Sequence, residues 1–201
     1  MALTSICGTL TAGQDNSCLT VVQRKYYQQL VLINRSSIDP DSIVVTVPTE
    51  EAPECAYNVQ FSLKDGETGY RFTANESGSS IKGFFDKSRD DNGNLQYNHQ
   101  VQALIMNVLE ESKCILSALD KGNFVAALQN GNTIEIFGLY NGLTTGDYTF
   151  DTQEGGGGTL ITLSNLEDNQ ESFLPFVYKS NPAGSEIADF DANFSNEAPS
   201  V

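Results

Sequence analysis

His99 is the one histidine of the sequence, so a Ser-His-Asp or Cys-His arrangement for nucleophilic catalysis would have to use it. None of the serines or cysteines lies in a recognisable nucleophile motif such as Gly-x-Ser-x-Gly. Glu110 and Glu111 are adjacent, so their side chains diverge in regular structure, whereas glycosidase chemistry needs two carboxyl groups facing one bond. We therefore expect His99 to be a surface or half-buried structural residue, and the chain not to be an enzyme.

Metal and phosphate sites are not predicted either. Counting from Asp86, the acidic stretch has its glycine at position eight instead of six, and Tyr97 at position twelve, which excludes an EF-hand calcium loop. The run Gly155–Gly158 precedes a strand-like segment and lacks a lysine, so it predicts a hairpin loop and not a phosphate loop. The cysteines contain no Cys-x-x-Cys pair that would indicate zinc: Cys7, Cys18, Cys55 and Cys114. We expect no metal and no cofactor.

The charge of the chain excludes some partners. Its 201 residues carry 26 Asp and Glu against 11 Lys and Arg, a formal net charge of −15. This charge disfavours binding to nucleic-acid phosphates and to anionic membrane surfaces. The sequence has no signal-peptide pattern and no apolar run of transmembrane length, so we expect reduced thiols in a cytoplasm. A Cys7–Cys18 disulfide is the alternative if the protein is exported.

The elements that would position these side chains are mostly strands. Apolar runs that alternate with polar residues or are rich in β-branched residues predict strands at 29–34, 43–47, 57–63, 69–74, 80–85, 124–129, 133–139, 147–150, 159–164 and 173–178. Asn130-Gly131 is typical of a tight hairpin turn. The predicted fold class is mainly β, an antiparallel β-sandwich or half-barrel.

A single amphipathic helix is predicted around residues 97–120. Apolar residues recur there at helical spacing, and Lys121-Gly122 provides a C-terminal stop. The apolar stripe consists of Val101, Leu104, Ile105, Val108, Leu109, Ile115, Leu116 and Leu119. This helix is expected to pack against the sheets.

Composition divides the chain into three parts. Residues 1–18 are predicted to form an N-terminal arm, 19–179 a single β-sandwich domain, and 180–201 an acidic tail without Lys or Arg. We expect a solvated tail. The alternative is an arm that orders against a neighbouring subunit, anchored by Phe190 and Phe194.

The layout resembles the major tail tube proteins of long-tailed bacteriophages, whose fold is shared with the tubes of contractile injection systems. The resemblance spans residues 21–178 and rests on the order of elements and on three phrases, Ile136-Phe137-Gly138-Leu139-Tyr140-Asn141-Gly142-Leu143, Gly146-Asp147-Tyr148 and Gly158-Thr159-Leu160-Ile161-Thr162-Leu163. It implies a virion structural protein without catalytic residues, which is assembled in the host bacterial cytoplasm and belongs to the virion tail.

The same resemblance implies hexameric rings stacked into a tube. Strands of each subunit would join a continuous inner β-barrel, and DNA would pass through an acidic channel without specific binding. Other tail proteins are the further partners implied, and no membrane is expected. The loop at residues 36–55 and the terminal arms would carry contacts between subunits, through Ile38, Ile43, Val45, Val47, Phe190 and Phe194.

Three other interpretations of the sequence remain open. The chain could be a head–tail connector, ring or decoration protein of a virion. It could be a secreted β-sandwich module that binds carbohydrate or protein, although it has no tryptophan to stack on sugars. An enzyme stays open mainly because acidic residues are abundant.

Overall fold

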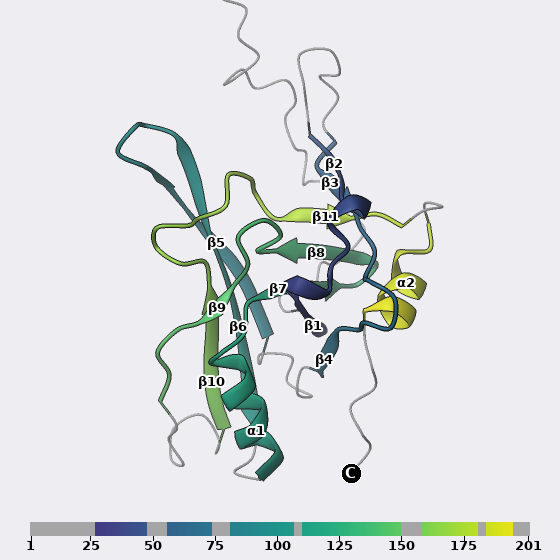
Figure 1. Cartoon of the computed structure of the whole chain (residues 1–201), viewed down its shortest axis with the longest axis vertical. Coiled ribbons are helices and arrows are strands. Elements are labelled where there is room, and N and C mark those ends of the chain that lie inside the picture. The colour runs from purple at the N-terminus through teal and green to yellow at the C-terminus, as the bar shows by residue number, and fades with distance from the viewer. Residues whose placement is uncertain are drawn as a thin grey trace, which may run out of the picture.

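The computed structural model describes residues 27–47, 56–73, 81–106, 110–149, 158–180 and 184–194, which form two β-sheets and two α-helices (Figure 1). The seven-stranded sheet has the order β2 (Val44–Thr46), β3 (Asn58–Gln60), β11 (Phe176–Tyr178), β8 (Thr133–Phe137), β7 (Phe124–Asn130), β1 (Gln29–Asn34) and β4 (Tyr70–Thr73). The four-stranded sheet has the order β5 (Ile81–Arg89), β6 (Leu95–Met106), β10 (Gly158–Ser164) and β9 (Thr144–Thr145). The helices are α1 (Glu110–Leu119) and α2 (Glu186–Asn193), with short 3-10 turns at Arg35–Ser37 and Pro40–Ser42.

The predicted fold class, mainly β with a sandwich of sheets, is confirmed. Strands pair antiparallel throughout the described residues except for β11 and β3, which run parallel. Within the described part of the chain, no helix is long and apolar enough to cross a membrane.

The central strands of the seven-stranded sheet are buried on both faces. In β1, Leu30 and Leu32 point into an inter-sheet cluster that also contains Val101 of β6, while Val31 and Ile33 point to the opposite face. Strand β7 repeats this division. A strand that is covered on both sides reads as a continuous apolar run, which is why both segments lack alternation.

The opposite face of the seven-stranded sheet packs against α2 and the segment that follows β1. We call this second core the outer cluster; its fully or nearly buried members are Val31, Ile33, Ile38, Val59, Phe61, Val125, Ala127, Ile134, Ile136, Leu139, Phe176, Tyr178, Phe190 and Phe194. The Phe194 ring lies 5.1 Å from the rings of both Phe61 and Tyr178, measured between centroids. Offset and edge-on ring pairs at this separation add to the free energy gained by burying their area.

The prediction of one helix at 97–120 is wrong for its first half. Residues Leu95–Met106 form the twelve-residue strand β6, and the helix covers only Glu110–Leu119. Val101, Ala103 and Ile105 are buried while Gln102 and Leu104 are half-buried, so the true period is two. The half-buried face of this strand also carries an apolar residue, Leu104. Together with Val101 and Ile105 it produces the spacing of a helical stripe, although the segment is a strand. Long-range pairing with β5 and β10 decides the outcome.

The helix is also not single, because α2 lies in the segment predicted to be a solvated tail. Phe190 is fully buried and Phe194 is 1 % exposed, so the described part of that tail, 184–194, is packed on the body. Three predictions fall on residues that lie outside the described ones: the N-terminal arm at 1–18, most of the run Gly155–Gly158, and Cys7, Cys18 and Cys55.

Two predicted hairpins also differ in detail. Asn130 pairs with Thr133, so Gly131 and Asn132 occupy the centre of the turn instead of Asn130-Gly131. A strand was predicted at 147–150, but the described part of this segment is not a strand. Besides β6, the strand that pairs with β10 is the short strand β9.

Candidate interaction surface

His99 is a buried structural residue, 2 % exposed, on the face of β6 that packs against the seven-stranded sheet. Its Nε2 lies 2.9 Å from the carbonyl oxygen of Phe173, and its Nδ1 accepts the N–H of Gly138 at 3.1 Å. These partners require a neutral ring with its proton on Nε2. Burial lowers the pKa of His99 to about 4. Both ring nitrogens are occupied by the backbone, so His99 has no nitrogen available to act as a general base on a substrate.

Glu171 and Asn165 extend this buried polar cluster. Glu171, 1 % exposed, accepts the backbone N–H groups of Tyr140 and Asn141 at 3.1 and 2.9 Å through Oε1. Burial raises the pKa of Glu171, and these hydrogen bonds act in the opposite direction. Asn165 accepts the N–H of His99 at 2.8 Å and donates to the carbonyl oxygen of Gly142 at 2.7 Å.

The buried cluster organises the loop 138–143, which contains most of the first phrase used for the resemblance. Gly138 and Gly142 have φ angles of +69° and +77°, which favour glycine, and the loop returns to pair Leu143 with Phe124. Each hydrogen bond of His99 and Glu171 described above goes to the loop, to a neighbouring backbone group or to Asn165. The cluster therefore holds the two sheets and their connections together and presents no group to a substrate.

The four-stranded sheet has one face packed on the core and one face toward solvent. We call the latter the outer face; its side chains are Lys82, Phe84, Asp86, Ser88, Gln96, Asn98, Gln100, Gln102, Leu104, Thr144, Leu160, Thr162 and Ser164. Cross-strand hydrogen bonds confirm that they share a face, because Gln100 donates to Asp86 at 2.9 Å and Gln102 to Thr162 at 3.2 Å. No described helix or strand covers it.

Both edges of this sheet are open within the described ranges. Strand β5, nine residues long, pairs with β6 alone. At the other edge, β9 pairs only with Leu163 and Ser164, and Gly146 donates to the carbonyl of Thr162, so residues 158–161 of β10 have no described neighbour on that side. Unpaired edge strands present backbone donors and acceptors that can pair with another chain.

The β5–β6 hairpin extends beyond the rest of the body, at the upper left of Figure 1. Its turn is closed by Asp90, whose carboxylate accepts the N–H of Asn92 at 3.0 Å and both the backbone and side-chain amides of Asn94. The oxygen-rich stretch noted in the sequence thus forms a hairpin turn. The described residues contain no group of three or more acidic, histidine or cysteine side chains placed to bind a metal ion.

The six residues predicted to contact other subunits lie elsewhere, in or against the outer cluster. Ile38, Phe190 and Phe194 are buried inside the chain's own core, and Ile43, Val45 and Val47 are half-buried against it. The structure therefore brings all six together on the far face of the seven-stranded sheet, away from the open edges of the four-stranded one. Sequence reasoning missed these edges, because no local pattern in β5 or β10 shows whether a second neighbour is present.

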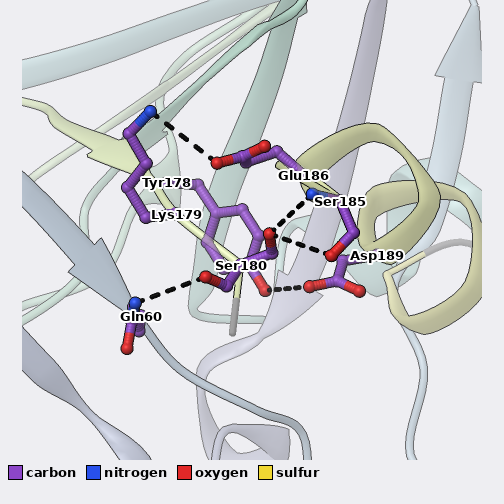
Figure 2. Close-up of polar contacts among 7 residues, drawn as sticks. All are labelled: Gln60, Tyr178, Lys179, Ser180, Ser185, Glu186 and Asp189. Atoms are coloured by element: carbon purple, nitrogen blue, oxygen red, sulfur yellow. Dashed lines mark hydrogen bonds and ion pairs between the residues drawn. The ribbon is translucent and has the colours of Figure 1, made fainter. Parts of the chain in front are cut away.

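Polar contacts hold α2 against the outer cluster of the seven-stranded sheet (Figure 2). Ser185, at the start of the helix, donates its backbone N–H and its hydroxyl to Oγ of Ser180 at 3.0 and 3.1 Å. Lys179 pairs with Glu186 at 3.7 Å, and the hydroxyl of Tyr178 donates to Asp189 at 3.3 Å. The groove beside α2, about 710 Å³, is lined by charges of both signs, including Lys64, Asp65, Glu67, Lys179 and Asp189.

Comparison of the chain with protein-family models, with curated proteins and with solved structures finds no match.

Proposed function

We propose that this protein is a virion structural protein, the subunit of a tail tube, which assembles into stacked hexameric rings around a channel. The observation that carries the proposal is the four-stranded sheet, which, among the described residues, has an uncovered outer face and an open edge on each side. The sequence resemblance is the reason for proposing a virion tail, and the open edges of the sheet are the reason for proposing that subunits assemble through it.

Two different open edges on one subunit favour a ring. When β5 of one copy meets the β10–β9 edge of the next, the contact is heterologous, and repeating it closes a ring if the rotation between copies allows it. A closed barrel removes every free edge, which relieves the aggregation hazard of a nine-residue edge strand. In such a ring the four-stranded sheets form the wall of the channel and the outer faces line it.

The remaining architecture is compatible with this role. In this proposal the seven-stranded sheet, α2 and the outer cluster lie behind the wall, and the buried His99–Glu171 cluster joins the two sheets. We propose that the projecting tip of the β5–β6 hairpin meets the neighbouring ring. Host cytoplasm during assembly and the virion tail afterwards are the proposed locations, with other tail proteins as the further partners.

Paired proline substitutions at Lys87 and Ser88 test the edge contact. Consecutive N–H groups in an antiparallel strand point alternately toward the neighbour and away from it, so one proline removes a bond to β6 and the other only an outward donor. The variant that keeps the wild-type melting temperature is the informative one. We expect rings or tubes of wild-type protein by negative-stain microscopy and size-exclusion chromatography, and monomers of that variant.

The second proline variant serves as the control for damage to the fold. A wild-type protein that stays monomeric at high concentration and shows no rings would overturn the proposed function. Rings that form equally well from the thermally intact proline variant would leave assembly in place and exclude the stretch of β5 around Lys87 and Ser88 as its edge.

A further inference from the structure

We propose that the channel wall is electrically neutral and lined by amide and hydroxyl groups, so that DNA moves along it without fixed charges to attract or repel it. This inference rests on the proposed function and replaces the acidic channel that the resemblance implies. It comes from the outer face of the four-stranded sheet alone.

Among the described residues of the outer face, Lys82 and Asp86 are the charged side chains, and their formal charges cancel. Asp86 also accepts the hydrogen bond from Gln100 at 2.9 Å. Most of the other side chains are amides or hydroxyls, and Phe84, Leu104 and Leu160 carry no charge either. The face is therefore neutral in a chain whose formal net charge is −15.

Apart from Asp86, the acidic side chains of the described residues lie outside the outer face. Most of them gather on or just after α1, at the tip of the β5–β6 hairpin, in the 61–68 loop, after β10 and on α2, as Glu110, Glu111, Asp120, Asp90, Asp91, Asp65, Glu67, Glu167, Asp168, Glu186, Asp189 and Asp191. The others are Asp39, Asp41, Glu135, Asp147 and Glu171. If the four-stranded sheets form the wall, these acids belong to the body and the ends of each ring. The net charge then keeps finished particles apart in solution instead of acting on the cargo.

Neutrality of the wall has a direct electrostatic consequence. Ring symmetry repeats every fixed charge of the face once per subunit, and stacking repeats it along the tube. DNA carries about one negative charge per 1.7 Å of its axis, so an acidic wall would repel it and a basic wall would hold it. Amide and hydroxyl side chains keep a water layer through hydrogen bonds and contribute no net potential within the Debye length, about 8 Å at physiological salt.

Charged thiol reagents can measure the potential at the wall. We would replace the four native cysteines by serine and introduce Gln102→Cys on the outer face. The rates with a cationic (trimethylammonium-ethyl) and an anionic (sulfonatoethyl) methanethiosulfonate are then compared between tubes and the proline variant that stays unassembled. A maleimide bearing a polymer too bulky for the channel reports which side of the tube the thiol faces. A protein retaining only Cys114, exposed on α1, is the reference.

We expect the bulky maleimide to be excluded from the introduced thiol in tubes, while both small reagents react. The cation-to-anion rate ratio should stay within about twofold of its value in the unassembled variant, because a neutral wall concentrates neither ion. Adding Gln100→Glu, two residues away on the same face, should raise the ratio in tubes, which confirms that the probe senses the wall.

Each contrary result has a separate meaning. A ratio raised on the order of tenfold in tubes without Gln100→Glu would overturn the neutral wall, because it indicates an acidic channel. Tubes in which the bulky maleimide reaches the thiol would place the outer face on the outside, and the inference fails while assembly stands. Absence of tubes at every concentration overturns the proposed function and this inference with it.

Discussion

At the scale of single residues, His99 shows how far side-chain chemistry can be judged from residue type. The sequence correctly suggested a structural role, but it placed the residue at a surface or half-buried, near the start of a helix. In the structure His99 lies on a strand and is 2 % exposed. Its partners, Gly138 and Phe173, are 39 and 74 residues away, so no local pattern could have found them.

The neutral state of His99 predicts a loss of stability in acid. Its folded pKa of about 4 lies below the ordinary value of 6.5, so the unfolded chain takes up the proton first. Stability is complete above about pH 6.5 and falls toward pH 4, by about 3 kcal/mol from this group. His99→Gln can keep both hydrogen bonds without titrating, and it should flatten this part of the profile in urea unfolding.

The raised pKa of Glu171 opposes this trend, because that carboxyl binds its proton more readily in the folded protein. The comparison of wild type with His99→Gln removes this contribution, since Glu171 is present in both. Parallel stability profiles for the two proteins between pH 4 and 6.5 would contradict the assignment of the slope to His99.

Gly142 is a position where any side chain should be costly. Its φ is +77°, and a Cβ built there would lie 1.6 Å from Oδ1 of Asn123. Gly142→Ala should destabilise the fold by about 2–4 kcal/mol in urea unfolding, from backbone strain together with the displaced Asn123. Gly131→Ala is the matched control, because Gly131 has a φ of +62° with open space around it. If the two variants lose the same free energy of unfolding, the Asn123 side chain moves aside without cost.

At the scale of elements, the largest difference between expectation and structure concerns β6. The apolar residues at positions 101, 104 and 105 have the spacing of a helical stripe. Val101, Ala103 and Ile105 equally have the spacing of a strand that is buried on one face. Pairing on both sides, over nine residues with β5 and seven with β10, stabilises the strand. Such non-local pairing cannot be read from a window of neighbouring residues. The hairpin β7–β8, whose contacts are local, was predicted almost to the residue.

Helix α2 should contribute strongly to stability despite its eight residues. Phe190→Ala leaves a cavity in the outer cluster, where the ring is fully buried, and should cost about 3–5 kcal/mol in chemical denaturation. Phe84→Ala removes the same atoms from the outer face, where the residue is 37 % exposed, and should cost under about 1 kcal/mol. Similar losses at both positions would show that α2 is not docked in solution.

At the scale of the whole molecule, charge should set the conditions for assembly. Copies with a formal net charge of −15 repel one another, and salt screens this repulsion within about 8 Å at physiological ionic strength. We expect the fraction of protein in rings to rise from low salt to physiological salt in size-exclusion chromatography. Assembly that weakens as salt is added would mean that ion pairs between subunits dominate the contact.

Fold class and most strand positions could be predicted from the sequence, because they follow from period, turn residues and composition. The candidate surface could not. Whether β5 or β10 has a second neighbour depends on the strand order of the finished sheet, in which β6 and β10 pair residues 52 to 64 positions apart. The six contact residues that the resemblance implied, from the loop 36–55 and the C-terminal arm, share one cluster in the structure.

The strand order also constrains how the chain folds during synthesis. Strands β2 and β3 join the rest of the seven-stranded sheet only through β11, which pairs in parallel with β3 and antiparallel with β8. The segment Phe176–Tyr178 must therefore be synthesised before the β2–β3 pair can join the rest of the seven-stranded sheet. Pairings of such sequence separation form slowly, and the early hairpin waits as an unpaired edge meanwhile. A chain that stops before β11 therefore leaves β2 and β3 unattached to the rest of the seven-stranded sheet.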